Sequence, residues 1–242
     1  MFLAMTEEEI CSTSPLPDSI AFLGCHFSPT THQLSGLPTA LPPDCGIILD
    51  DRCAIPDADT DQIAAQLSAL KPAFILMDFQ RPPTEASAKL AAALTKLDCP
   101  IPMPPAYGKD LPCPLFLPPV PPHIPIAEYL KKWTNREIWL ELALDAVQIT
   151  ITPQGSEIAP FPHARPAEKP HNDSMLHCHY KITQRTDALT FYCYRTKEDI
   201  CTMLQSPLPP NVTHTIGLFQ ELWDISCYKL LFTVRTVRRA GT

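Results

Sequence analysis

Two short stretches share one pattern: residues 46–52, GIILDDR, and residues 74–81, FILMDFQR. Each is a run of apolar residues that ends in an acidic residue and then in arginine. Continuous apolar runs are typical of strands that are buried on both faces, as in parallel sheets. Gly46, Ala73 and Pro100 are also equally spaced along the chain, at about the length of one β-α unit. The two stretches therefore predict neighbouring parallel strands.

Segments with helical spacing lie between the predicted strands. Residues 59–70 and 84–97 place leucines on one face and begin at residues that commonly cap helices. Repeated β-α units favour a parallel sheet or a closed barrel. We therefore predict an α/β fold, a small irregular (β/α)8 TIM-like barrel, with an open doubly wound sheet as the alternative. The eight expected strands are 20–27, 46–52, 73–81, 100–104, 114–120, 137–144, 190–194 and 215–222.

The whole chain, 1–242, is expected to form a single barrel domain. Residues 1–18 are expected to be an N-terminal extension, and residues 225–242 a C-terminal tail. Residues 146–194 contain alternating polar and apolar positions around short turns, which predicts a late insertion of antiparallel hairpins. Many of the 29 prolines stand at segment ends, so the connections between elements are expected to be rigid.

Composition excludes several classes of function. A net charge of −7 argues against a nucleic-acid partner. No apolar run approaches the roughly 20 residues of a membrane span, and the first 18 residues do not resemble a signal peptide. The ten cysteines contain no C-x-x-C pair, so we interpret them as free thiols. Together these features predict a cytoplasmic protein without a membrane partner, while a protein partner stays unknown.

Polar residues gather where the predicted strands end. In parallel barrels the active site lies at the carboxyl ends of the strands, and carboxylates there can act as acid, base or nucleophile. An alternative is that Asp50 or Asp51 pairs with Arg52 and caps the following turn. The predicted site comprises His26, Asp50, Asp51, Arg52, Asp78, Gln80 and Arg81, with Glu221 from the last strand.

Residues 73–80, AFILMDFQ, resemble the chitinase-type strand of family 18 glycoside hydrolases, D-x-x-D-x-D-x-E. In that family the final glutamate protonates the glycosidic oxygen, and the preceding aspartate orients the N-acetyl group of the substrate. Asp78 matches that aspartate, Gln80 stands in place of the glutamate, and Ala73 and Leu76 replace the two earlier aspartates. Glutamine has no titratable proton and cannot be a general acid. The resemblance thus implies a degenerate barrel, or another acid, for which Glu141 and Glu221 are available.

The aromatic residues Tyr107 and Trp223 could stack on sugar rings, since aromatic faces pack on apolar ring faces. His177 and His179 share one face of a predicted strand, but no spacing in the chain is diagnostic of a metal site. We predict no cofactor and no metal. The expected function is a glycoside-hydrolase-like barrel that binds an oligosaccharide or is catalytically degenerate. The alternatives are a non-enzymatic protein-interaction scaffold and a metal-dependent hydrolase.

Overall fold

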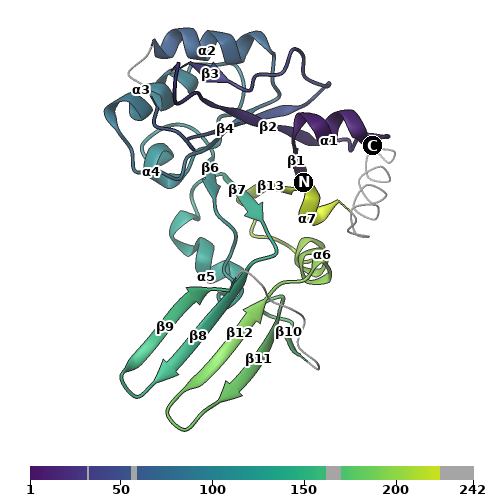
Figure 1. The fold of residues 1–242 in the computed structure, drawn as a ribbon, viewed down its shortest axis with the longest axis vertical. Coiled ribbons are helices and arrows are strands. Elements are labelled where there is room, and N and C mark those ends of the chain that lie inside the picture. Colours follow the sequence, from purple (N-terminus) through teal and green to yellow (C-terminus); the bar gives the residue numbers. More distant parts are fainter. Residues whose placement is uncertain (32, 56–58, 162–169, 224–242) are drawn as a thin grey trace. The chain divides into compact units, whose positions relative to one another are not determined.

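The computed structural model describes residues 1–31, 33–55, 59–161 and 170–223 (Figure 1). The predicted tail 225–242 lies outside these residues. The chain divides into two compact units, which are described separately below. The first unit comprises Met1–Pro118, Asn135–Glu141 and Asn211–Phe219, and the second comprises Pro119–Thr134, Leu142–Pro210 and Gln220–Thr242.

The first unit is built on a curved sheet of parallel strands (Figure 1). Along the sheet the order is β5-β4-β2-β1-β13-β7-β6, and the short strand β3, Leu34–Ser35, pairs antiparallel with β2. Each strand is short and mostly apolar, which suits burial on both faces. The strands are β1 (Phe2–Met5), β2 (Ile20–Phe27), β4 (Gly46–Asp50), β5 (Ile75–Asp78), β6 (Leu115–Leu117), β7 (Ile138–Leu142) and β13 (Val212–Leu218).

Residues 100–103 close the sheet into a barrel, because they lie between β5 and β6 and hydrogen-bond to both sides. On one side, Ile75 N donates to Pro100 O and Met77 N donates to Pro102 O, both at 3.0 Å. On the other side, Met103 N donates to Pro114 O at 3.1 Å, and a parallel bridge joins Met103 to Leu115. Because prolines have no N–H, the segment accepts hydrogen bonds from β5 at Pro100 and Pro102 and returns none there.

Large side chains fill the barrel interior. Phe2, Phe74 and Trp139 meet with ring centroids 4.7 to 5.6 Å apart, and His214 stacks on Trp139 at 4.2 Å. Gly46 makes room for this cluster, because a Cβ there would lie 2.1 Å from the Phe74 ring. The interior is therefore a packed core rather than a channel, as in other small barrels.

Short helices follow several of the strands. α2 (Thr60–Ala69) begins at Asp59, whose carboxylate accepts the Asp61 and Gln62 N–H groups. α3 (Glu85–Leu94) begins with a capping box between Thr84 and Ser87, and α2 packs against α3. Both helices were expected from their leucine spacing. The remaining helices of this unit are α1 (Glu7–Ser12) and α4 (Pro105–Gly108).

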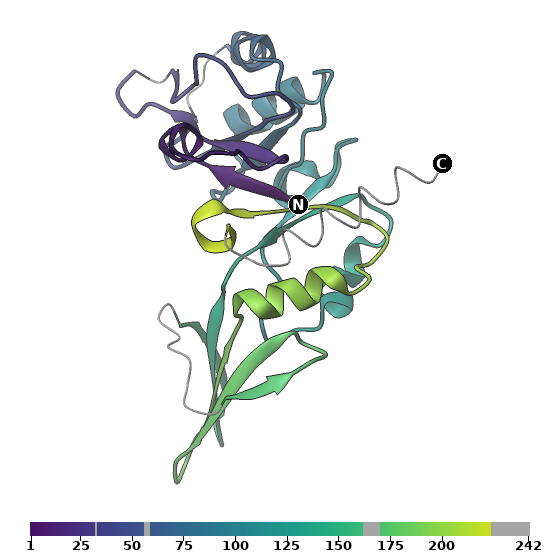
Figure 2. The ribbon, with the colours of Figure 1, turned by 90° about the vertical axis from the view of Figure 1, so that its right-hand side faces the viewer.

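The second unit is built on a five-stranded antiparallel sheet (Figure 2). Its strand order is β10-β11-β12-β8-β9, and neighbouring strands in this order pair antiparallel. The strands are β8 (Ala146–Thr152), β9 (Gly155–Pro160), β10 (His171–Asp173), β11 (Cys178–Gln184) and β12 (Leu189–Tyr194).

The helices of the second unit are α5 (Ile126–Leu130), the 3-10 turn η1 (Lys131–Trp133) and α6 (Lys197–Gln205); α7 (Phe219–Leu222) follows β13. α6 starts with a capping box between Thr196 and Asp199. The same Asp199 carboxylate accepts a hydrogen bond from His179 Nδ1 at 2.7 Å. The cap therefore also ties α6 to strand β11.

The predicted fold class, an irregular (β/α)8 barrel with late antiparallel hairpins, is confirmed. One expected barrel strand is wrong, because residues 190–194 form β12 of the second sheet. The missing barrel strand is β1, within the segment expected to be an N-terminal extension. Eight of the described cysteines are free, whereas Cys201 is disulfide-bonded, which corrects the free-thiol interpretation for that residue. None of the helices in the described ranges has the length and apolar character needed to span a bilayer.

Candidate functional site

Three of the predicted site residues lie in one row at the carboxyl ends of adjacent barrel strands. His26 of β2 is the register partner of Asp50 of β4, and Asp50 is the register partner of Asp78 of β5. In parallel strands such partners share one edge of the sheet. His26 Nδ1 hydrogen-bonds Gly24 O at 2.7 Å, which fixes its ring against its own strand. The sequence prediction of a common rim therefore agrees with the strand register.

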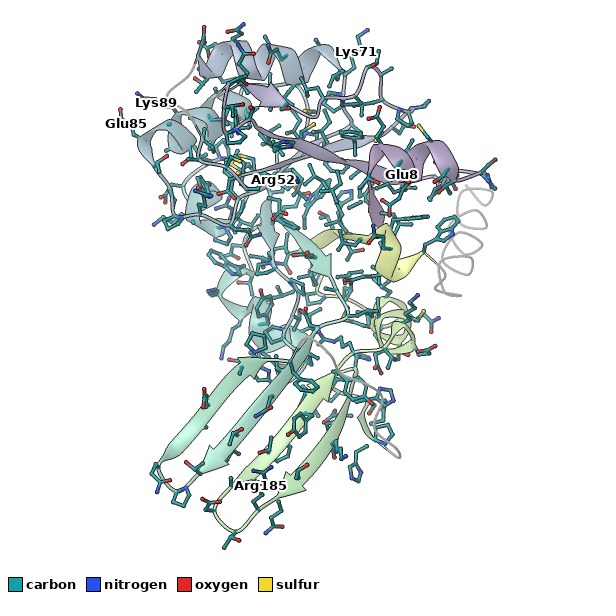
Figure 3. The ribbon with its side chains drawn as sticks, viewed as in Figure 1. Glu8, Arg52, Lys71, Glu85, Lys89 and Arg185 are labelled. Atoms are coloured by element: carbon teal, nitrogen blue, oxygen red, sulfur yellow. The ribbon has the colours of Figure 1, made fainter. Side chains whose placement is uncertain are left out.

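Asp50 is bound by Arg52, the residue two positions later. The Arg52 Nε lies 2.9 Å from each Asp50 carboxylate oxygen, Nη2 also contacts Oδ2, and the Arg52 backbone N–H donates to Oδ1 at 3.0 Å. The Asp50 side chain is 14% exposed and that of Arg52 is 56% exposed. Figure 3 labels Arg52 in the first unit. The alternative pairing of Asp50 with Arg52 is thus realised.

Asp51 is buried and joins two strand ends. One of its oxygens accepts Gln80 N–H and the other accepts Arg81 N–H, both at 2.8 Å. A carboxylate that accepts backbone N–H groups makes charge-assisted hydrogen bonds, which are stronger than neutral ones. Asp51 therefore holds the chain after β5 against the chain after β4, and both of its oxygens are engaged in doing so.

Asp78 and Gln80 form the central pair of the rim. The Gln80 amide Nε2 donates to Asp78 Oδ1 at 2.6 Å. Burial raises the pKa of Asp78 above its ordinary value, the Gln80 hydrogen bond lowers that pKa in part, and the charges of Asp50 and Asp51 raise it further. Asp78 is thus a carboxyl group whose ionisation is disfavoured by its surroundings.

The loop after β5 is fastened by two further contacts. Arg81 Nη2 donates to Arg52 O at 2.9 Å, and the Tyr107 hydroxyl donates to Arg81 O at 3.0 Å. The Tyr107 ring is buried and makes an edge contact with Phe79 at 5.3 Å. Its hydroxyl and ring therefore support the loop backbone from inside the first unit.

A small hollow of about 40 Å³ lies inside the mouth of the barrel. Asp78 and Glu141 both line it, among apolar side chains that include Ile48, Leu76 and Phe116. Glu141 lies two residues after the inward-facing Trp139, so the period of a strand also turns it inward. At roughly 10–15 Å³ of such volume per water, the hollow holds a few water molecules. Larger ligands would have to bind above it.

Glu221 and Trp223 belong to the second unit. Glu221 Oε2 accepts the Leu144 N–H at 3.2 Å, and Trp223 is 39% exposed. The structure brings His26, Asp50, Asp51, Arg52, Asp78, Gln80, Arg81 and Tyr107 together in the first unit, and leaves the proposed roles of Glu221 and Trp223 as predictions. Within the described ranges there is no set of three histidine, cysteine or acidic side chains able to hold a metal ion.

Comparisons with known proteins bear on the fold. No family model matches the chain, and no curated protein matches it. The spore cortex-lytic enzyme SleL of Bacillus cereus superposes with a TM-score of 0.50 at 10% identity, over 96% of this chain and 73% of that chain. A chitinase of Chromobacterium violaceum gives a TM-score of 0.49 at 8% identity, over 87% of this chain and 90% of that chain. The match to SleL shows a shared barrel fold.

Proposed function

We propose that this chain is a catalytically degenerate glycoside-hydrolase-like barrel that binds an oligosaccharide at its rim without cleaving it. The observation that carries the proposal is the Gln80–Asp78 hydrogen bond. Gln80 occupies the position of the acid in the motif that residues 73–80 resemble, and its amide is 2.6 Å from the Asp78 carboxylate. An amide at that position can donate a hydrogen bond but cannot deliver a proton to a leaving group.

The other acids of the first unit are poorly placed to replace it. Asp50 is held by Arg52, and Asp51 is buried with both oxygens bound to backbone N–H groups. Asp78 and Glu141 face a hollow with room for only a few water molecules. A glycosidic oxygen needs an acid within hydrogen-bond reach, and a sugar held above the hollow would meet Gln80 first.

The rim nevertheless offers groups that bind hydroxyls. Gln80 and Arg81 are exposed, and Arg52 keeps 56% of its side chain accessible while Asp50 orients it. Planar donors that are already held in place lose little conformational entropy when a ligand binds. The compared structures are those of a cortex-lytic enzyme and a chitinase, so oligosaccharides of N-acetylglucosamine are the first probes.

The test measures binding and cleavage separately with chitooligosaccharides. Isothermal titration calorimetry on the full chain should show binding, and chromatography of the same mixtures should show no new products. Gln80→Ala should weaken binding, because it removes a rim donor, whereas Gln66→Ala on the exposed face of α2 is the matched control. Cleavage by the wild-type chain would refute degeneracy. Absence of binding at millimolar ligand would refute the oligosaccharide role.

A second function, an interaction scaffold, is favoured by one specific observation. The antiparallel sheet of the second unit leaves Ile151, Ile158 and Ile182 more than 40% exposed. Large exposed apolar patches commonly mark interaction sites. The metal-dependent alternative has no comparable support in the described residues, where no ligand set was found.

A further inference from the structure

The sheet of the second unit has two chemically different faces. Ile182 pairs with Phe191, Phe191 with Ile149, and Ile149 with Ile158, so four apolar residues form one row across four strands. Directly paired residues in antiparallel strands point to the same face. Leu189 and Ile151 pair in the next row of that face. We call Ile149, Ile151, Ile158, Ile182, Leu189 and Phe191 the apolar face.

The intervening residues form a polar face. Thr183, Thr190, Thr150 and Glu157 make one of its rows. The same face carries His179 near the start of β11, where the ring hydrogen-bonds Asp199 of α6. Helix α6 is therefore hydrogen-bonded to the sheet on the polar face.

The apolar face is open to solvent along its outer strands. Ile158 is 55% exposed, Ile151 44% and Ile182 43%, while Ile149, Leu189 and Phe191 are half-buried. Burial of apolar area contributes about 25 cal/mol per Å², so a folded sheet with one bare apolar face gains by covering it. Figure 2 shows these strands extending beyond α6 within the second unit.

We propose that the apolar face binds the same face of a second copy of this chain, as two sheets packed face to face. The face has no formal charge on β8, β9, β11 or β12, since Glu157 and Lys181 lie on the polar face. The charges nearest to its ends are Asp173 of the neighbouring β10, whose carboxylate accepts the Met175 and Leu176 N–H groups, and the oppositely charged Arg185 and Asp187 in the turn between β11 and β12 (Figure 3 labels Arg185). Two chains of net charge −7 can therefore meet there without placing like charges in contact.

The size of the face limits the area that this dimer can bury. Strands about 4.8 Å apart and roughly 3.3 Å per residue give four strands of about seven residues a face of roughly 400 Å². Two copies then bury on the order of 1,000 Å², near the lower limit for a specific interface. A two-fold pairing of aligned sheets is a common packing geometry. We therefore expect a weak, concentration-dependent dimer with a dissociation constant in the micromolar range.

Sedimentation equilibrium of the full chain from about 1 to 500 μM tests the proposal. Ile158→Lys should raise the dissociation constant roughly tenfold or more, because a two-fold interface meets each substitution twice. Ala159→Lys adds the same charge one residue away on the polar face and should leave the constant within about twofold. Ile182→Lys repeats the test on another strand. Circular dichroism checks that each variant is folded.

The outcomes separate clearly. A wild-type dimer that is weakened by Ile158→Lys and Ile182→Lys, and not by Ala159→Lys, supports the proposal. A wild-type chain that stays monomeric over the whole range overturns it and points to a different partner for the face. A dimer that Ala159→Lys weakens equally, or that added salt dissociates, also overturns it, because the proposed contact carries no charge.

Discussion

Removing the Asp51 carboxylate should destabilise the barrel rim more than removing the carboxylate of Asp50 or Asp78. Asp51 is 3% exposed, and its two oxygens accept the Gln80 and Arg81 N–H groups at 2.8 Å. A hydrogen bond to a charged group contributes about 1.5–3 kcal/mol, and the loss of the acceptor leaves each buried donor unsatisfied. Asp51→Ala should therefore destabilise the loop after β5 by roughly 4 kcal/mol, and Asp51→Asn, which keeps one acceptor, by about 2 kcal/mol.

Amide hydrogen exchange is the suitable assay, because the chain has two units and a global unfolding curve would report on both. At about 1.4 kcal/mol per factor of ten, exchange of the Gln80 and Arg81 amides should accelerate roughly 30-fold in Asp51→Asn and about a thousandfold in Asp51→Ala. Asp110→Asn is the matched control, since that side chain is 85% exposed and its Lys109 contact is 4.0 Å. Unchanged exchange at Gln80 and Arg81 in Asp51→Ala would show that the Asp51 carboxylate does not hold the loop after β5.

Three other predictions concern the rim, the barrel interior and the thiols. Burial raises the pKa of Asp78, so the neutral carboxyl is favoured in the folded state, and the stability that it contributes is lost as pH rises from the ordinary value of 3.8 through the raised pKa. Asp78→Asn should therefore gain stability relative to the wild type as pH rises through that range, as amide hydrogen exchange of strand β5 would show. A pH-independent difference between the two chains would contradict it. Gly46→Ala should lower the free energy of unfolding by roughly 1–3 kcal/mol, because the added methyl group overpacks against Phe74. Phe74→Leu should recover part of that loss in the double variant, whereas additive losses would disprove the contact. Burial raises the pKa of Cys25 and of Cys178 to about 12. Iodoacetamide at pH 8 should therefore label exposed Cys11 in the native chain, and Cys25 and Cys178 only after denaturation, as mass spectrometry of peptides would show. Labelling of Cys25 in the native chain would be inconsistent with that burial.

The strands that end in acid were predictable because their composition and spacing are unusual together. Residues 46–52 and 74–81 pointed to adjacent parallel strands, and the register of Asp50 with Asp78 follows from that pairing. The short stretch FLAM of β1 carried no such signal, since four apolar residues before three glutamates suit a terminus equally well. Residues 190–194 were assigned to the wrong sheet because β-branched and aromatic residues favour strands of either kind.

The fine structure of the rim depends on loop geometry that local sequence does not encode. Asp50 and Asp51 are adjacent and identical in type, yet Asp50 binds Arg52 and Asp51 turns inward to the chain after β5. Tyr107 was one candidate for stacking on a sugar, and no sequence pattern pointed to the hydrogen bond of its hydroxyl with Arg81 O, 26 residues earlier in the chain. The inward position of Glu141 could have been predicted from the sequence, because Glu141 lies two residues after Trp139 and alternate residues of a strand face the same side.

Residues 100–103, which close the barrel, also affect whether a partly unfolded chain can pair with another chain. When a barrel opens between β5 and residues 100–103, each side exposes a strand edge that can recruit another chain. On the edge facing β5, Pro100 and Pro102 present carbonyl groups without N–H donors, so an incoming strand could form only half of a hydrogen-bond ladder there. The prolines therefore place a barrier to intermolecular β-pairing at one side of the opening, while the closed barrel keeps the hydrogen bonds that β5 donates.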